Sequence, residues 1–168
     1  MKRKFLVSLS ALSLVMLLSI SSANAQTSLG AFLAFGTEIE TLGIGVNGEF
    51  YVTDAITIAP DIIYFFPNTT EFPGSGEIKS KLFEINANGH YHFDLGSSVM
   101  PYALVGIGIA IVGVEAFGFD DSTTDIGLNL GGGADFDIGS SIMPFGEIRY
   151  ATNTSQLVIM GGVRLPLN

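Results

Sequence analysis

The sequence predicts an all-β chain that folds into an eight-stranded antiparallel up-and-down barrel. The first observation is a repeated alternation of apolar and polar residues, which occurs in eight separate runs. The second is that short turns and longer connections follow one another along the chain, as they do in a series of hairpins. A third feature, the N-terminal segment, indicates where such a barrel would be delivered.

The N-terminal segment has the pattern of a secretion signal. Residues 2–4 are basic, Phe5 to Ile20 is apolar apart from serines, and Ala23 and Ala25 are the small residues of a cleavage site. We therefore expect a signal peptide over residues 1–25 that carries the chain out of the cytoplasm.

The remaining segment, residues 26–168, has the length of one domain, and we expect it to be a single barrel. It holds 143 residues, with 4 basic and 16 acidic side chains, so its formal net charge is −12. This acidic excess argues against nucleic acid as a partner. The chain has no cysteine, which excludes a disulfide framework and thiolate metal sites.

Eight runs show the period of two that is typical of a strand whose faces meet different environments. The predicted strands are residues 29–37, 42–52, 55–66, 81–93, 100–114, 125–138, 142–151 and 156–165. Most are long enough to cross a bilayer as tilted strands, which requires about 9 to 11 residues.

The fourth run is the clearest, and its polar face consists of Glu84, Asn86, Asn88, His90 and His92. Four other runs have clear apolar faces. In the second run this face is Ile44, Val46, Phe50 and Val52, and in the sixth it is Leu128, Leu130, Ala134, Phe136 and Ile138. In the seventh it is Ile148 and Tyr150, and in the eighth it is Leu157, Ile159, Val163 and Leu165. The fifth run is apolar throughout, but proline, glycine and β-branched residues favour a strand over a membrane helix.

The connections alternate in length, and a repeat relates two of the short ones. Residues 67–79 and 115–124 are predicted to be long loops, whereas the other connections are shorter. Phe93–Tyr102 matches Phe136–Phe145 at an offset of 43 residues, which corresponds to two strands with one long and one short connection. Equivalent turns are therefore expected on the same rim, as in an outer-membrane barrel.

Alternation alone leaves open a soluble secreted barrel with an apolar interior. Two observations favour the opposite orientation, with the apolar face toward lipid. Six glycines lie on the polar face, where they suit the narrow interior of an eight-stranded barrel: Gly43, Gly45, Gly106, Gly108, Gly131 and Gly133. Aromatic residues lie near both strand ends of the apolar face, as in the two girdles of a membrane barrel: Phe50, Phe93 and Phe136, and Phe35, Tyr64, Phe66, Phe83 and Tyr150.

Three segments, Tyr51–Thr57, Met100–Gly108 and Pro144–Tyr150, carry a resemblance to a known family. The chain resembles the small eight-stranded outer-membrane β-barrels, which include OmpX-like proteins and OmpA transmembrane-domain-like proteins. The resemblance implies a monomer in the outer membrane of a Gram-negative bacterium, surrounded by lipid and lipopolysaccharide and inserted by the barrel-assembly machinery. Many such proteins end in an aromatic residue that this machinery reads, whereas this chain ends in Leu165-Pro166-Leu167-Asn168.

Ten ionisable side chains are predicted to face the lumen: Glu49, Asp61, Glu84, His90, His92, Asp135, Asp137, Glu147, Arg149 and Arg164. Carboxylate–guanidinium pairs are the natural way to satisfy charge in a narrow interior. We interpret the set as a structural charge network that plugs the barrel. The alternative is a selective pore or gate.

His90 and His92 lie about 7 Å apart on one strand face. With Glu84 nearby in the sequence they could hold a metal or assist a hydrolase, but the sequence places no third ligand or nucleophile. Polar lumen residues are the preferred interpretation. We therefore predict no catalytic, cofactor or metal site.

The acidic segment Glu115–Asp125 matches no calcium-binding loop and is interpreted as solvated. No G-x-S-x-G, HExxH or phosphate-loop motif is present. The favoured function is a non-enzymatic outer-membrane barrel with a structural role, or a surface-interaction role through its outer loops. The alternatives are a narrow channel for small or apolar solutes, a soluble secreted barrel, and a lipid-modifying enzyme that uses His90 or His92.

Overall fold

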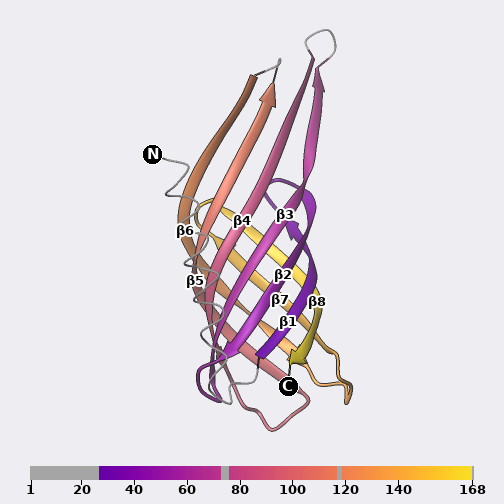
Figure 1. Ribbon diagram of the computed structural model, residues 1–168, viewed down its shortest axis with the longest axis vertical. Helices are drawn as coiled ribbons and strands as arrows, with labels where there is room; N and C mark the ends of the chain where they lie inside the picture. The colour runs from indigo at the N-terminus through magenta and orange to yellow at the C-terminus, as the bar shows by residue number, and fades with distance from the viewer. Residues whose placement is uncertain (1–26, 73–75, 117–118, 168) are drawn as a thin grey trace.

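The computed structural model describes residues 27–72, 76–116 and 119–167, which form a closed antiparallel barrel (Figure 1). Its strands are β1 (Thr27–Gly36), β2 (Thr41–Tyr51), β3 (Ile56–Phe72), β4 (Gly76–His92), β5 (Val99–Ala116), β6 (Phe119–Phe136), β7 (Met143–Ala151) and β8 (Gln156–Leu167). The predicted fold class is confirmed. The predicted signal peptide at 1–25 lies outside the described residues. A search of the described residues for a helix long and apolar enough to cross a membrane finds none.

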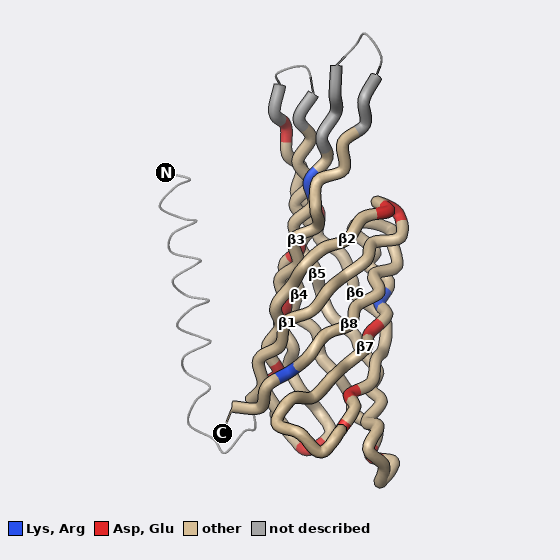
Figure 2. Tube along the Cα trace, turned by 90° about the vertical axis from the view of Figure 1, so that its right-hand side faces the viewer, with Lys and Arg blue, Asp and Glu red and all other residues tan. Residues whose placement is uncertain are grey.

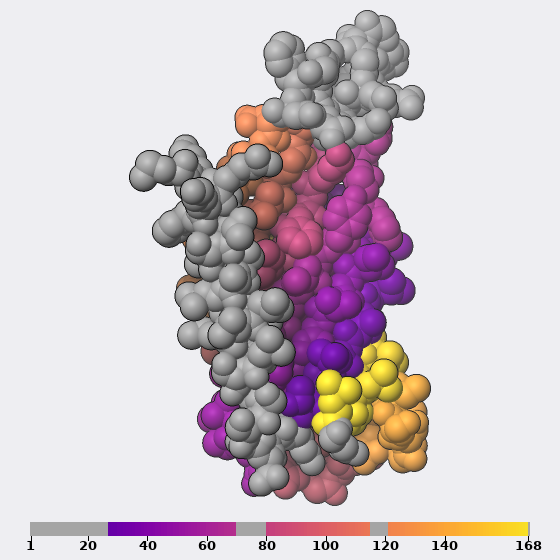
Figure 3. Space-filling model, viewed as in Figure 1, coloured from indigo at the N-terminus to yellow at the C-terminus, as the bar shows by residue number. Residues whose placement is uncertain are grey.

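Each strand pairs with the next along the chain, and β1 pairs with β8 to close the barrel. The closing register runs from Thr27 opposite Leu167 to Gly36 opposite Val158. Figure 3 shows the start of β1 in indigo beside the end of β8 in yellow at the lower rim. Closure pairs the backbone groups of both terminal strands, which is a requirement for a sheet surrounded by hydrocarbon.

The two segments predicted to be long loops are mostly strand, and this part of the prediction is wrong. β3 and β4 remain paired up to Phe72 opposite Gly76, and β5 and β6 up to Ala116 opposite Phe119. They form two hairpins that rise above the other strands (Figure 1). Alternation arises only where the two faces of a strand meet different environments, so a hairpin that extends beyond the barrel has no such signal.

The outer wall of the barrel is apolar. Its exposed side chains include Leu33, Val105 and Leu128, with 61%, 60% and 54% of their surface exposed. The aromatic residues predicted for the two girdles also face outward, among them Phe93 and Phe136 near the short turns and Tyr64, Phe66 and Tyr150 toward the hairpins. An apolar band between aromatic girdles is the surface of a membrane barrel, whereas a soluble barrel buries its apolar side chains inside.

The short turns confirm the internal repeat. Gly96 and Gly139 both have a positive φ, of 61° and 70°. Each backbone N–H donates to the aspartate two residues earlier, with N···O distances of 2.9 Å to Asp94 and 2.8 Å to Asp137. The two copies of the repeat therefore build the same turn on the same rim, and we take this short-turn rim as the periplasmic one.

Glycines on the inner face make room for lumen side chains. A Cβ at Gly106 or Gly108 would overlap the amide oxygens of Asn88 and Asn86. The other inward glycines predicted from the sequence likewise lie against lumen side chains or neighbouring backbone. The narrow interior thus depends on small residues at the positions where large polar groups cross it.

Candidate functional site

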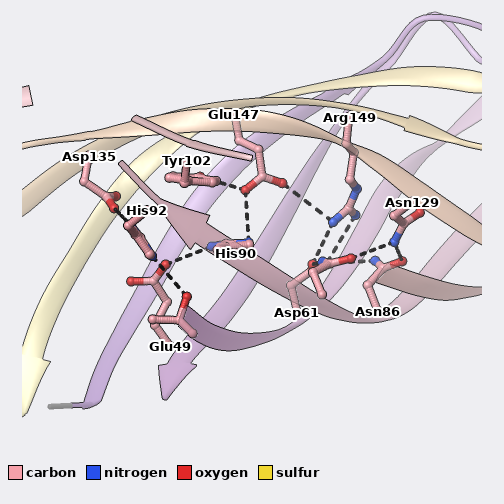
Figure 4. A network of polar contacts seen from close by, with 12 residues as sticks. Glu49, Asp61, Asn86, His90, His92, Tyr102, Asn129, Asp135, Glu147 and Arg149 are labelled. Carbon is pink, nitrogen blue, oxygen red and sulfur yellow. Dashed lines mark hydrogen bonds and ion pairs between the residues drawn. The ribbon is translucent and has the colours of Figure 1, made fainter. Parts of the chain in front are cut away.

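The barrel lumen is the candidate site, and nine of the ten predicted lumen residues point into it. These nine side chains have at most 9% of their surface exposed: Glu49, Asp61, Glu84, His90, His92, Asp135, Glu147, Arg149 and Arg164. They come from β2, β3, β4, β6, β7 and β8, and Figure 4 shows most of them converging across the interior. The lumen therefore collects charges that lie far apart in the sequence.

Asp137 is the exception, and its placement in the lumen must be corrected. β6 ends at Phe136, and Asp137 lies exposed in the following turn, where its carboxylate accepts the Gly139 N–H. The alternating pattern continues by chance into this turn. The internal repeat could have placed Asp137 correctly. Asp137 aligns with Asp94, which follows the predicted strand 81–93 and therefore lies in a predicted turn.

The first group of contacts, the Arg149 centre, consists of Asp61, Glu84, Asn86, Asn88, Asn129, Arg149 and Gln156. Arg149 donates two hydrogen bonds to Asp61, at 2.7 Å and 3.2 Å, and lies 3.4 Å from a Glu84 oxygen. Such a forked pair fixes both the distance and the orientation of the guanidinium. Because Arg149 is fully buried, these carboxylates supply the charge compensation that its burial requires.

Three asparagines complete the Arg149 centre. Asn86 and Asn88 each donate to one Asp61 oxygen at 2.8 Å. Asn129 donates to the amide oxygens of both, at 2.9 Å and 3.0 Å. These three amides were not among the predicted site residues. Asn86 and Asn88 share the polar face of Glu84 and His90 on β4, and Asn129 occupies the polar face of β6 between Leu128 and Leu130, so their alternating positions were the signal that could have found them.

The second group, the Arg164 centre, consists of Glu49, His90, His92, Tyr102, Asp135 and Arg164. Arg164 pairs with Asp135 and lies 3.3 Å from a Glu49 oxygen. Its guanidinium also sits 3.9 Å from the ring centroid of Phe145, within the range of a cation–π contact. This centre lies nearer the short turns, because His92 is the last residue of β4.

Aromatic stacking orders the two histidines. His90 stacks on Tyr102 with ring centroids 4.3 Å apart, and its Nδ1 lies 3.2 Å from Glu49 Oε1. His92 contacts the Thr57 hydroxyl at 3.1 Å and stacks on Tyr51. Glu84, which is near these histidines in the sequence, contacts Arg149 and Gln156 instead.

Glu147 connects the two centres. One of its oxygens accepts the Tyr102 hydroxyl at 2.8 Å and lies 3.8 Å from His90 Nε2, while the other lies 3.9 Å from Arg149. Tyr102 was missed by the sequence analysis because it lies in the fifth run, where almost every residue is apolar. The polar contacts consequently extend without interruption from one centre to the other (Figure 4).

An apolar layer closes the lumen toward the hairpins. Its buried members include Ile63, Phe65, Leu82, Ala110 and Val158, and Ile39 and Val112 pack against them. Between the charged centres, a cavity of about 10 Å³ lined by Asp61, His90 and Glu147 is just large enough for one water molecule. Side chains thus fill the described interior around the charged centres, and a cavity of about 180 Å³ lies at the hairpin end beside Phe65, Leu82 and Val112.

The fold and this filled lumen define a closed eight-stranded barrel of the bacterial outer membrane. The sequence matches the family described as outer membrane protein beta-barrel domain over residues 10–162, and the chain belongs to this family. The resemblance inferred from the sequence is thereby confirmed, together with the outer-membrane location. A search of curated proteins finds no match.

Solved outer-membrane barrels share the fold. The N-terminal barrel domain of Pseudomonas aeruginosa OprF superposes with a TM-score of 0.66 at 14% identity, covering 84% of this chain and 97% of that one. Neisserial surface protein A gives 0.61 at 20% identity, covering 85% and 96%. Ail, the attachment invasion locus protein of Yersinia pestis, gives 0.59 at 14% identity, covering 84% and 95%.

Proposed function

We propose that this protein is a non-enzymatic outer-membrane barrel that presents two long β-hairpins at the cell surface and has a structural or interaction role. The filled lumen is the observation that carries this proposal. Arg149 and Arg164 are completely buried and bound to carboxylates, and the apolar layer lies across the interior above them. An ion or solute crossing the barrel would have to break several buried ion pairs at once.

The hairpins β3–β4 and β5–β6 supply the interaction surface. They extend past the loop ends of β1–β2 and β7–β8 (Figures 1 and 2). Loops and hairpins on a rigid barrel are where surface barrels carry variable function. A lipid-modifying role receives no support from the geometry, because His90 and His92 point into the lumen rather than toward lipid.

The charge of the β5–β6 hairpin favours a cationic partner. The segment from Glu115 to Asp125 contains four acidic residues and no basic one. The side chains of Glu115 and Asp120 lie outside the described residues, so this argument concerns their charge and not their position. Ail has been crystallised with the heparin analogue sucrose octasulfate. A polysulfate of that kind would be repelled here, whereas lipopolysaccharide phosphates would bind through bridging divalent cations.

The surrounding lipid and lipopolysaccharide, insertion by the barrel-assembly machinery and a monomeric state all belong to this proposal. The apolar outer wall supports the lipid contact, and closure of β1 on β8 leaves no open strand edge within the barrel wall for a second copy.

Conductance in planar bilayers tests the closed barrel. The purified protein should insert without producing steady unitary currents. A reproducible unitary conductance would overturn the proposal in favour of the narrow channel. Heat-modifiable gel migration of the same sample shows that the inserted protein is folded.

Labelling of intact cells tests the orientation of the hairpins. An epitope inserted between Phe72 and Gly76 should bind antibody on intact cells. The matched insertion in the short turn at Gly96 should bind antibody only after the outer membrane is permeabilised. The reverse pattern would show that the hairpins face the periplasm, and the proposed surface role would fail.

A further inference from the structure

The Arg164 centre contains a donor set suited to a metal ion. Glu49, His90 and His92 each bring one ligand atom within 4.8 Å of the other two. Two imidazole nitrogens and a carboxylate oxygen are ligands that divalent transition metals, and Zn²⁺ in particular, prefer in proteins. The two histidines share one face of β4, and the narrow lumen brings Glu49 to them from β2, two strands away.

A fourth donor points to the same place. Asp135 is fully buried, and one of its oxygens, Oδ1, pairs with Arg164. Its other oxygen, Oδ2, accepts no hydrogen bond and lies 3.9 Å from His92 Nδ1. A buried carboxylate oxygen without a donor is costly, and Oδ2 is the only such oxygen among the fully buried atoms of the described residues. A cation would satisfy it.

The distances are close to those of a tetrahedral site. Neighbouring ligands of a zinc ion with bonds of about 2.0 to 2.1 Å lie roughly 3.3 Å apart. His90 Nδ1 and Glu49 Oε1 already lie 3.2 Å apart. The wider separation at His92 closes by rotation of the side chain of this last residue of β4, which has a short turn beyond it.

Neighbouring groups would orient these ligands. A neutral His90 that offers Nδ1 to a metal carries its proton on Nε2, which faces Glu147 at 3.8 Å. Tyr102 holds that glutamate and stacks on the His90 ring, while Arg164 lies beside both ligand carboxylates. Carboxylates behind metal-bound histidines commonly fix the tautomer and the ring orientation.

The charge of the lumen also favours a cation. Five buried carboxylates, Glu49, Asp61, Glu84, Asp135 and Glu147, face two buried guanidiniums, so the formal sum with neutral histidines is −3. A divalent ion reduces this to −1. We propose that Glu49, His90, His92 and Asp135 form a binding site for a divalent transition-metal ion, first of all Zn²⁺, which ties β2, β4 and β6 together.

Calorimetry and electron paramagnetic resonance test the site. The untagged barrel is refolded in detergent without lipopolysaccharide, whose phosphates bind cations, and is treated with a chelator. It should then bind one Zn²⁺, and Cu²⁺ used as a probe should show splitting from two nitrogens. His90→Gln and His92→Gln should each weaken Zn²⁺ binding by about tenfold or more, as losses at metal sites do.

Asp135 and Asp137 provide a matched comparison, in which Asp135 is the proposed ligand and Asp137 is the control. Asp135→Asn should weaken binding, whereas Asp137→Asn removes the same charge two residues away in the exposed turn and should leave binding unchanged. Heat-modifiable migration verifies the fold of each variant. Absence of zinc binding, or full binding by both histidine variants, overturns the proposal. If a variant fails to fold, a copper spectrum of the unmutated barrel without nitrogen splitting overturns it as well.

Discussion

The Arg149 centre and the Arg164 centre place the same kind of buried guanidinium in two different surroundings. Around Arg149 the other polar groups are amides, and Asn86, Asn88 and Asn129 form a chain of hydrogen bonds to Asp61. Around Arg164 they are imidazoles, which contact the same carboxylates as the guanidinium, and the Tyr102 ring, which stacks on His90. Amides are neutral donors and acceptors of hydrogen bonds, whereas imidazole is the side chain that most often binds a metal.

We therefore expect the Arg149 centre to have a purely structural role, whereas the Arg164 centre can rearrange its contacts when a charge is removed. Removal of Arg149 leaves its carboxylates with neutral amide donors only. Removal of Arg164 leaves Glu49 and Asp135 in contact with His90 and His92, which remain in place. The following predictions test this difference, in order of decreasing effect.

Arg149→Ala should have the largest effect. It leaves Asp61 and Glu84 buried without a cation, and breaking a buried pair in this way costs about 3 to 5 kcal/mol. Urea unfolding in lipid vesicles measures the loss, and the melting midpoint in detergent should fall. Arg149→Lys keeps the charge and should lose less. An unchanged midpoint for Arg149→Ala would contradict the structural role of this network.

Arg164→Ala should destabilise the barrel less, by about 1 to 3 kcal/mol, the usual cost of leaving buried polar groups unsatisfied. The reason is that His90 and His92 still contact the two carboxylates that Arg164 releases. The same unfolding measurement ranks the two variants. A loss equal to or greater than that of Arg149→Ala would show that the histidines do not compensate.

Asn129→Ala should cost about 1 to 2 kcal/mol, because two buried amide oxygens lose their donor. Asn68→Ala is the control, since Asn68 is exposed and makes one long bond of 3.4 Å to the Ile39 carbonyl. Comparison of the two denaturation midpoints gives the result. Equal midpoints for the two variants would show that the hydrogen bonds of Asn129 do not stabilise the barrel.

Asp137→Ala should have the smallest effect, about 0.5 kcal/mol or less, as expected for an exposed residue. Asp94→Ala should match it, because both side chains accept the N–H of a turn glycine. Asp135→Ala, by contrast, removes the buried partner of Arg164 and should be clearly more destabilising. If Asp137→Ala were as severe as Asp135→Ala, the correction of its position would itself be wrong.

Much of the fold could be predicted because the two environments of a membrane barrel mark the chain at every second residue. The eight strands, their order and the outward aromatics followed from that signal. The extended hairpins could not be found in this way, since residues 67–72 and 76–79 belong to strand ends that rise above the other strands (Figure 1), beyond the part of the barrel where a period of two is imposed.

The candidate site was only partly predictable. Nine of its charged residues were recognisable by the face on which they lie, and Asp137 was misplaced because alternation does not show where a strand ends. Pairings were beyond reach. Arg149 reaches Asp61, 88 residues earlier in the chain, whereas Glu147, two residues away on the same strand, contacts Arg149 only at 3.9 Å.

The sequence by itself therefore determined which side chains enter the lumen, because the direction of a side chain is a local property of the strand. Only the tertiary structure decided which of them meet, because the closure of the barrel and the tilt of its strands set the level at which each side chain crosses the interior. Glu49 illustrates this point. Its alternating position predicted an inward carboxylate, but only the closed barrel places it beside His90 rather than Arg149.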